Sequence, residues 1–205
     1  MVGKSDMRVI KERHIQKLNY NLQTNYIFIH INKCGGGTVE AALGLPWLHM
    51  TAAECIEVLG RERWNSIFSF TFVRNPWDKV VSHYHHRVAT NQTGLGESQL
   101  DFNDWVKLSY GENDPRYYDK PVMFMPQVDW LTDSRGEQVV NYIGRFESLQ
   151  PDFDEICTLL ELPSKPLLHV RKSVRSYYKD YYTPQTRGII AEWFAKDIEE
   201  FGYTF

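Results

Sequence analysis

The sequence predicts an α/β domain in which a mostly parallel sheet lies between two layers of helices. Three short apolar runs, rich in aromatic and β-branched residues, are typical of buried strands; they span 26–31, 67–73 and 138–143. Segments with helical patterning alternate with these runs, as in parallel sheets that carry helices on both faces. Ligands of such folds bind at the carboxyl ends of the strands. We therefore look for functional residues just after the first two strands.

Helix signals separate the expected strands. Thr51 and Glu54 fit a capping box, and Asn75 followed by Pro76 is a strong helix start directly after the second strand. Helices are expected at 38–44, 51–63, 76–88, 101–110, 151–162 and 184–201.

The chain length fits a single domain over residues 1–205. Within it, 1–25 is expected to be an N-terminal extension. The polar, glycine-bearing stretch 90–135 is the least regular part, and we expect it to form a variable lid or acceptor-binding region.

Charge and cysteine content narrow the function classes. The formal net charge is −3, so no overall field attracts nucleic acid or an anionic membrane. The three cysteines include no CxxC pair, which argues against a disulfide framework. No signal-peptide core and no apolar run of membrane-spanning length is visible. These features predict a soluble, cytoplasmic protein that does not bind nucleic acid.

The stretch HINKCGGGT, residues 30–38, has the composition of a phosphate-binding turn. Glycines between a strand and a helix allow an anion to approach the helix N-terminus, where Lys33 adds a full charge and Thr38 a hydroxyl donor. The Walker pattern places its lysine after the glycines, whereas Lys33 precedes them, and no GK[ST] occurs. A cysteine phosphatase of the C-x5-R type would need Arg at position 40, which is Glu. Cys34 is therefore expected to pack within the loop rather than act as a nucleophile.

A second element follows the next strand. Arg74 ends that strand, and Ser82 stands eight residues later, about two turns into the following helix. A guanidinium forks well onto a phosphate, and a serine can donate to it from the helix flank. Either residue alone would be unremarkable, but together with the glycine loop they suggest two phosphate sites in one crevice.

These elements together resemble the sulfotransferases that use 3′-phosphoadenosine 5′-phosphosulfate (PAPS). HINKCGGGT is similar to their 5′-phosphosulfate loop, and FVRNPWDKVVSHY to their 3′-phosphate element. The resemblance continues through YIGRFESLQPDFDEI and through RKSVRSYYKDYYTP…DIEEFGYTF, and it is strongest to the carbohydrate-type, Golgi-related and bacterial branch. It covers about residues 26–205 and implies the P-loop-NTPase-like sulfotransferase fold.

The resemblance also implies residue roles. Lys33 would contact the bridging oxygen between phosphate and sulfate, while the loop backbone and the Thr38 hydroxyl would hold the 5′-phosphate. Arg74 and Ser82 would hold the 3′-phosphate. The loop residues assigned to the donor are Lys33, Cys34, Gly35, Gly36, Gly37 and Thr38. A closing loop would add Arg171, Lys172, Ser173 and Arg175. The family often has Pro where Asn32 stands and Thr-Ser where Gly37-Thr38 stand, which leaves the role of Thr38 less supported than that of the loop.

The implied reaction is the transfer of a sulfuryl group from PAPS to an acceptor hydroxyl, with PAP as the second product. His49 is the first candidate for the general base because related enzymes often keep a histidine in this interval, and His86 is the second. Trp47, Trp105 and Trp130 could line an acceptor cleft, although such residues more often pack in a core.

We expect no metal, and a carbohydrate is the favoured acceptor. A small metabolite, a lipid or a tyrosine stays open as the acceptor, as do a P-loop kinase or hydrolase and a non-catalytic nucleotide-binding protein as functions. The sequence leaves the oligomeric state undetermined.

Overall fold

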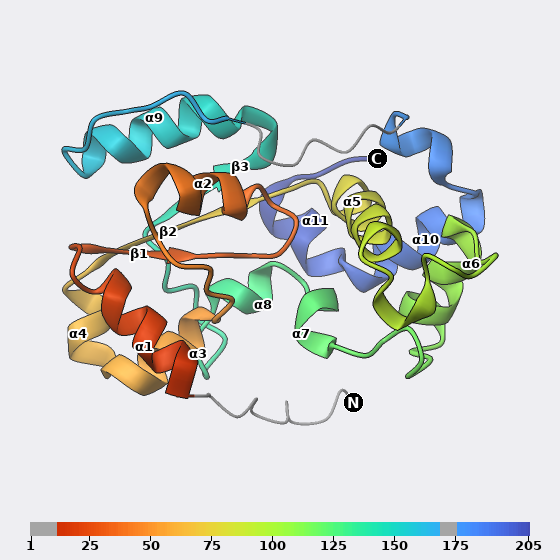
Figure 1. Ribbon diagram of the computed structural model, residues 1–205, viewed down its shortest axis with the longest axis horizontal. Helices are drawn as coiled ribbons and strands as arrows, with labels where there is room; N and C mark the ends of the chain where they lie inside the picture. Colours follow the sequence, from red (N-terminus) through yellow and green to blue (C-terminus); the bar gives the residue numbers. More distant parts are fainter. Residues whose placement is uncertain (1–11, 169–175) are drawn as a thin grey trace.

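A three-stranded parallel sheet lies at the centre of the computed structural model, which describes residues 12–168 and 176–205 (Figure 1). Its strands, in spatial order, are β1 (Tyr26–Ile29), β2 (Phe68–Val73) and β3 (Tyr142–Arg145). Phe28 pairs with Phe70, which in turn pairs with Tyr142. Parallel neighbours need crossover connections, and helices supply them. The predicted α/β class with a parallel sheet is confirmed.

Helices cover both faces of this sheet (Figure 1). One face carries α2 (Gly36–Leu43) and α9 (Leu149–Leu159). The other carries α1 (Glu12–Asn21), α3 (Ala52–Leu59), α4 (Arg61–Asn65) and α8 (Val128–Leu131). The strands supply aromatic and branched side chains such as Ile27, Phe70 and Phe72, each at most 1% exposed, to a core between the layers. α1 falls in the expected N-terminal extension, yet its Leu18 is fully buried in this core.

A second hydrophobic core lies beside the sheet. It forms among α5 (Pro76–Ala89), α6 (Phe102–Val106), α7 (Pro121–Phe124) and α10 (Pro184–Trp193), with α11 (Ala195–Phe201) following α10. Short 3-10 or π turns at Gln92–Gly94, Lys107–Gly111, Phe146–Ser148 and Tyr178–Tyr181 connect these elements. Trp105 is fully buried in the second core and Trp130 in the first. Neither can line an acceptor cleft, which corrects the expectation for these two tryptophans.

Several element boundaries differ from the sequence-based expectation. The single helix expected at 51–63 is divided into α3 and α4 because Gly60 takes φ 78° and ψ 152° between them. The helix expected at 184–201 is divided at Phe194, whose φ of −104° and ψ of 28° fit neither helix. Phe194 is fully buried, so packing outweighs helical continuity there.

The third strand begins four residues later than expected. Asn141 stands just before it and accepts hydrogen bonds on Oδ1 from the Ser69 backbone and hydroxyl, while its own N–H donates to the Ser69 carbonyl. Gln138 forms an antiparallel bridge with Thr132 instead of joining the sheet. The expected strand 138–143 is therefore displaced relative to β3, because Gln138 pairs with Thr132 and residues 139–141 precede the strand.

Candidate functional site

The loop between β1 and α2 has a backbone that restricts which residues fit. Lys33 takes φ 66° and Gly35 φ 83°, both in the left-handed region, and Gly35 precedes the first turn of α2. A Cβ on Gly36 would lie 2.0 Å from Cδ2 of His30, so only glycine fits. The first N–H groups of a helix have no partner within the helix, and the helix dipole makes this end attractive to an anion. Loop and helix start therefore fit a phosphate group.

Arg74 joins this loop to the end of β2. Its Nη1 donates to the Lys33 carbonyl at 2.8 Å, and its Nε and Nη2 donate to Asp78 Oδ2 at 2.8 and 2.7 Å. The guanidinium also lies 3.8 Å from the centre of the Phe146 ring, and the residue is 5% exposed. Asp78 thus orients Arg74 as well as complementing the dipole of α5. The structure brings together two of the predicted elements, the glycine loop and Arg74.

Gln127 ties the same two elements to α11, and sequence reasoning missed it. Its Oε1 accepts from the Arg74 backbone N–H at 2.8 Å and from Cys34 Sγ at 3.1 Å. Its Nε2 donates to the Arg74 carbonyl at 2.9 Å and to Asp197 Oδ2 at 3.0 Å. Gln127 is fully buried and uses both lone pairs and both amide protons. No motif identifies this glutamine. The only signal in the sequence is a polar residue directly after the apolar stretch 121–126.

Cys34 behaves as the sequence predicted. It is 1% exposed, its thiol donates to Gln127, and burial raises its pKa to about 12. The thiol is therefore held protonated and packs beneath the loop.

His49 contacts the residue that starts the loop. Its Nδ1 donates to the His30 carbonyl at 2.8 Å, and the two imidazole centres lie 4.1 Å apart. Because a carbonyl only accepts, this bond requires the proton on Nδ1 and leaves the ring's lone pair on Nε2. His49 is half-buried and packs against His30, whose ring fills the space beside Gly36.

His30 itself is a packing residue. It is 4% exposed and its Nδ1 lies 2.9 Å from Glu40 Oε2, although the two atoms lack good hydrogen-bond geometry. Burial, with a smaller contribution from Lys33, lowers the pKa of His30 to about 3. Burial raises the pKa of Glu40 to about 7. The contact is therefore between a neutral imidazole and a carboxyl group that is partly protonated near neutral pH, rather than a conventional ion pair.

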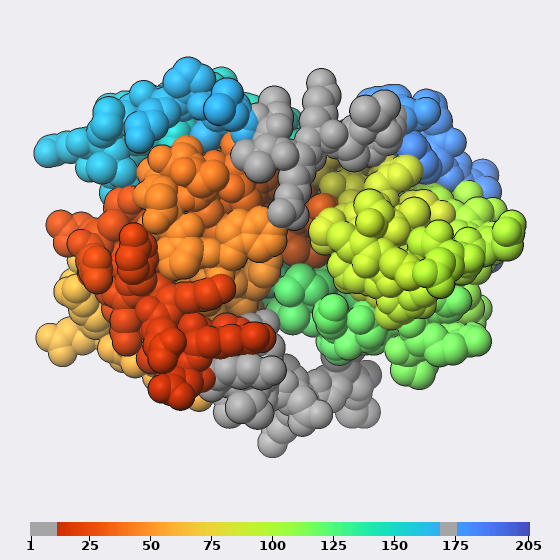
Figure 2. Space-filling view, viewed as in Figure 1, coloured from red at the N-terminus to blue at the C-terminus, as the bar shows by residue number. Residues whose placement is uncertain are grey.

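Ser82 and His86 both lie on α5 and are half-buried. At the helical rise of 1.5 Å per residue, Ser82 stands about 9 Å and His86 about 15 Å along the axis from the start of α5. Figure 2 shows α2 in orange and α5 in yellow-green as neighbouring masses on one face. The predicted closing-loop residues Arg171, Lys172, Ser173 and Arg175 lie outside the described residues.

A family model provides the deciding comparison. The model for the sulfotransferase family matches residues 47–204, more than half of the chain. The chain belongs to the sulfotransferase family. This confirms the resemblance inferred from the four ordered motifs.

Two further comparisons accompany this assignment. This sulfotransferase is 25% identical over 121 residues to an uncharacterized protein of Archaeoglobus fulgidus, a match that covers 59% of the present chain and 90% of the relative. A crystal structure of a sulfotransferase from Alicyclobacillus acidocaldarius matches 86% of the chain and 93% of its own, at 15% identity and a TM-score of 0.49.

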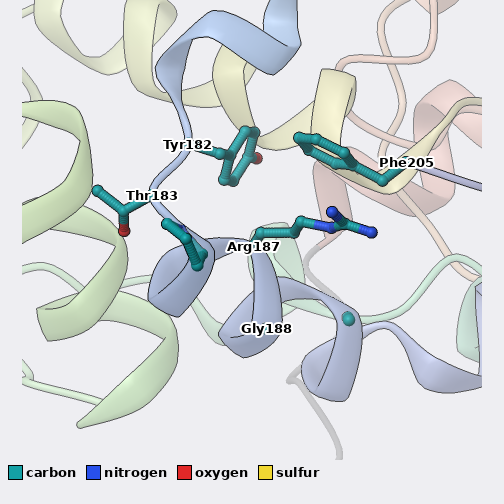
Figure 3. Close-up of a pocket in the computed structure, with 7 residues that line it drawn as sticks. Tyr182, Thr183, Arg187, Gly188 and Phe205 are labelled. Carbon is teal, nitrogen blue, oxygen red and sulfur yellow. The ribbon is translucent and has the colours of Figure 1, made fainter.

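A separate pocket of about 320 Å³ lies on the α10 side of the sulfotransferase (Figure 3). Figure 3 shows Arg187 extending beneath Phe205, with Tyr182 beside Phe205; the two aromatic rings have centroids 5.6 Å apart. The indole of Trp77, near the start of α5, donates to the Arg187 carbonyl at 3.1 Å and contacts the Phe205 ring. None of the predicted site residues lines this pocket.

Two further properties of the described part of the sulfotransferase concern metal binding and membrane crossing. Within 12–168 and 176–205, no three His, Cys, Asp or Glu side chains gather into a metal-binding group. In the same ranges, no helix has the length and apolar character to cross a bilayer.

Proposed function

We propose that this sulfotransferase moves the sulfuryl group of PAPS to an acceptor hydroxyl, with a carbohydrate as the acceptor class. The observation that carries the proposal is the hydrogen bond from Arg74 to the Lys33 carbonyl. It holds the two predicted phosphate-binding elements, from separate strands, against each other. A donor with phosphates on both its 5′ and 3′ positions needs two such elements, whereas ATP needs only one of them.

The residues of the first element fit the phosphosulfate end of the donor. The glycine loop at the start of α2 offers main-chain N–H groups, and Thr38 is half-buried at the same helix end. Lys33 would stabilise the charge that develops on the leaving phosphate as the S–O bond breaks. The left-handed conformation of Lys33 fixes where its side chain leaves the backbone.

The second element would bind the 3′-phosphate. Asp78 neutralises part of the charge of Arg74, so Arg74 contributes mainly orientation and hydrogen bonding, with Ser82 as a further donor. The Arg74–Asp78 ion pair has little net positive charge to offer a phosphate. We propose that further positive charge comes from the closing loop, through Arg171, Lys172 and Arg175, with Ser173 as a donor.

His49 is proposed as the general base. The tautomer fixed by the His30 carbonyl supports the role, because Nε2 can then take the proton of the acceptor hydroxyl during attack on sulfur. His86 is the second candidate. Sulfuryl transfer by positioning, charge neutralisation and proton removal needs no metal in this scheme.

Thermal stabilisation by nucleotides tests the proposal. PAP should raise the unfolding temperature, by an amount equivalent to about 2.7 kcal/mol when present at 100 times its Kd. ATP or GTP with Mg²⁺ should have a much smaller effect. Stabilisation by ATP with Mg²⁺ and none by PAP would replace the proposal with a kinase or hydrolase.

Catalysis needs a second measurement. Radioactive sulfate from labelled PAPS should appear on a member of a screen of neutral glycans, small metabolites, lipids and tyrosine peptides. Binding of PAP without transfer to any of them would indicate a non-catalytic nucleotide-binding protein.

A further inference from the structure

Trp47 lies directly against the phosphosulfate loop. A Cβ built on Gly37 would lie 2.9 Å from Trp47 Cζ2, which is closer than van der Waals contact allows. It would also touch Cε2 and Nε1 of the same indole, at 3.5 and 3.6 Å. The indole therefore occupies the space that any side chain at position 37 would need. Gly37 has an ordinary helical backbone, so its lack of a side chain is explained by this neighbour rather than by its conformation.

The backbone around Trp47 is held in place from two sides. Lys17 Nζ, from α1, donates to the Trp47 carbonyl at 2.7 Å. The next residue, Leu48, donates its N–H to Glu40 Oε1 in α2 at 3.1 Å. The indole also meets the rings of His30 and His49 edge-on, at centroid distances of 5.8 and 6.2 Å. Trp47 is thus positioned between the loop and the proposed base.

Its exposure is what distinguishes Trp47 from its counterparts. The residue is 48% exposed, whereas Trp64, Trp105 and Trp130 are at most 2% exposed. Nearly half of a large, neutral, apolar side chain is thus open to solvent beside the proposed site, and a ligand that covered it would gain the free energy of burying apolar surface. The acceptor must approach exactly this space, because its hydroxyl has to reach both the donor sulfate and His49.

We propose that Trp47 is the acceptor-stacking residue and that it takes a sugar ring through that ring's C–H face. The inference rests on the proposed function and makes its acceptor class specific. A pyranose presents axial hydrogens on a flat face and hydroxyls around its edge, so stacking on an indole leaves one edge hydroxyl free to react. A phosphorylated metabolite would gain little from this single neutral ring, and an alkyl chain would cover it without presenting a hydroxyl to the donor sulfate.

Nuclear magnetic resonance of the tryptophan indoles tests the proposal. The ¹⁵N-labelled full chain, with and without PAP, is titrated with cellohexaose, a neutral oligosaccharide with flat apolar ring faces. The Nε1–H signal of Trp47, assigned by its loss in Trp47→Phe, should shift saturably. The signal of Trp193, which is partly exposed and donates to the Phe124 carbonyl, is the internal control and should stay in place.

Two comparisons make the result decisive. Sorbitol, an acyclic polyol without an apolar ring face, should give no saturable shift at equal hydroxyl concentration. By calorimetry, Trp47→Phe should keep cellohexaose affinity within about threefold, while Trp47→Ala should lose at least tenfold, a loss of about 1.4 kcal/mol. An unmoved Trp47 signal, an equal shift with sorbitol, or unchanged affinity in Trp47→Ala would each overturn the proposal. Failure of PAP to bind would instead refute the proposed function. The cellohexaose titration without PAP would still test whether Trp47 binds a sugar ring.

The contact with Gly37 is checked separately. Gly37→Ala should lower the unfolding temperature and weaken the cellohexaose response, because the new methyl group displaces the indole. In a Trp47→Ala background the same substitution should cost almost nothing. An equal loss of unfolding temperature in both backgrounds would show that Gly37 and Trp47 do not share this space.

Discussion

The guanidinium of Arg74 hydrogen-bonds to the main-chain carbonyl of Lys33, across 41 residues of sequence. The bond connects the residue after β2 to the residue that would contact the leaving phosphate. Removal of the Arg74 side chain should therefore also alter the backbone position of Lys33. The chemistry proposed for the two ends of the donor depends on one shared geometry.

Arg74→Ala should remove the preference for PAP over adenosine 5′-monophosphate, which lacks the 3′-phosphate. It should also lower the free energy of unfolding by about 1–3 kcal/mol, because Asp78 and the Lys33 carbonyl lose their partner. Ser82→Ala is the second test variant, since it removes the other predicted phosphate donor from a half-buried site with less structural cost. Nucleotide affinities by calorimetry provide the measurement. An unchanged preference in both variants would exclude these residues from the 3′-phosphate site.

His49→Ala should reduce kcat by about 10²–10⁴-fold while PAP still binds, because a general base acts on the acceptor proton and not on the nucleotide. His86→Ala is the comparison variant. The rates are measured with labelled PAPS and the acceptor from the glycan screen. If His86→Ala loses activity and His49→Ala retains it, the base role moves to His86.

Gln127→Leu should destabilise the protein by about 3 kcal/mol or more. The substitution leaves the Arg74 N–H and carbonyl without a partner in a fully buried region, and it removes one of the two hydrogen bonds that Asp197 Oδ2 accepts from residue 127. Gln138→Leu is the control, because Gln138 is exposed and its Nε2 makes one long bond, 3.3 Å, to the Val140 carbonyl. Its cost should stay within about 0.5 kcal/mol. Urea unfolding compares the two, and similar costs would contradict a supporting role for Gln127.

Glu40→Gln should change how stability depends on pH. Burial raises the pKa of Glu40 to about 7, so the folded state holds this proton more tightly than the unfolded state does. The resulting stabilisation is complete below the unfolded pKa near 4.5 and is lost as the pH rises through 7. The advantage of the natural protein over the variant should therefore be up to about 3 kcal/mol larger at pH 4.5 than at pH 7.5.

His30 titrates in the opposite sense, since its pKa is lowered to about 3 and its contribution grows as the pH rises towards 6.5. In the natural protein the pH-dependent contributions of His30 and Glu40 to stability oppose each other. The contribution of Glu40 is therefore taken as the difference in unfolding free energy between the natural protein and Glu40→Gln. Chemical unfolding at both pH values measures it. A difference that does not change with pH would show that the pKa of Glu40 is the same in the folded and unfolded states.

The α/β architecture and the helix caps could be predicted from the sequence alone. Strand–turn–helix order, the apolar runs and the Asn75-Pro76 cap are local signals, and the cap is present at the start of α5. The family match, over residues 47–204, confirms the family and does not include the glycine loop. Capping at Thr51 and Glu54 is present as expected. Such features follow from short-range chemistry, which a sequence displays directly.

Features that depend on tertiary packing were not visible. The break at Phe194 follows from burial of its ring, and the shift of β3 follows from hydrogen bonds between Asn141 and a residue 72 positions earlier. Gln127 carries no local signature, because its partners are set by the fold. Trp47 could not be told apart from Trp105 and Trp130 until their exposures were known.

The bonds around Gln127 also bear on how the protein folds. They join residues separated by 53 and 70 positions, and they close only after both β2 and α11 have been made. Contacts of such long sequence separation form slowly, since the entropy of closing the intervening chain is lost before they contribute. We therefore expect the proposed donor site to assemble late in folding, so that the appearance of nucleotide binding during refolding would mark the arrival of the native state.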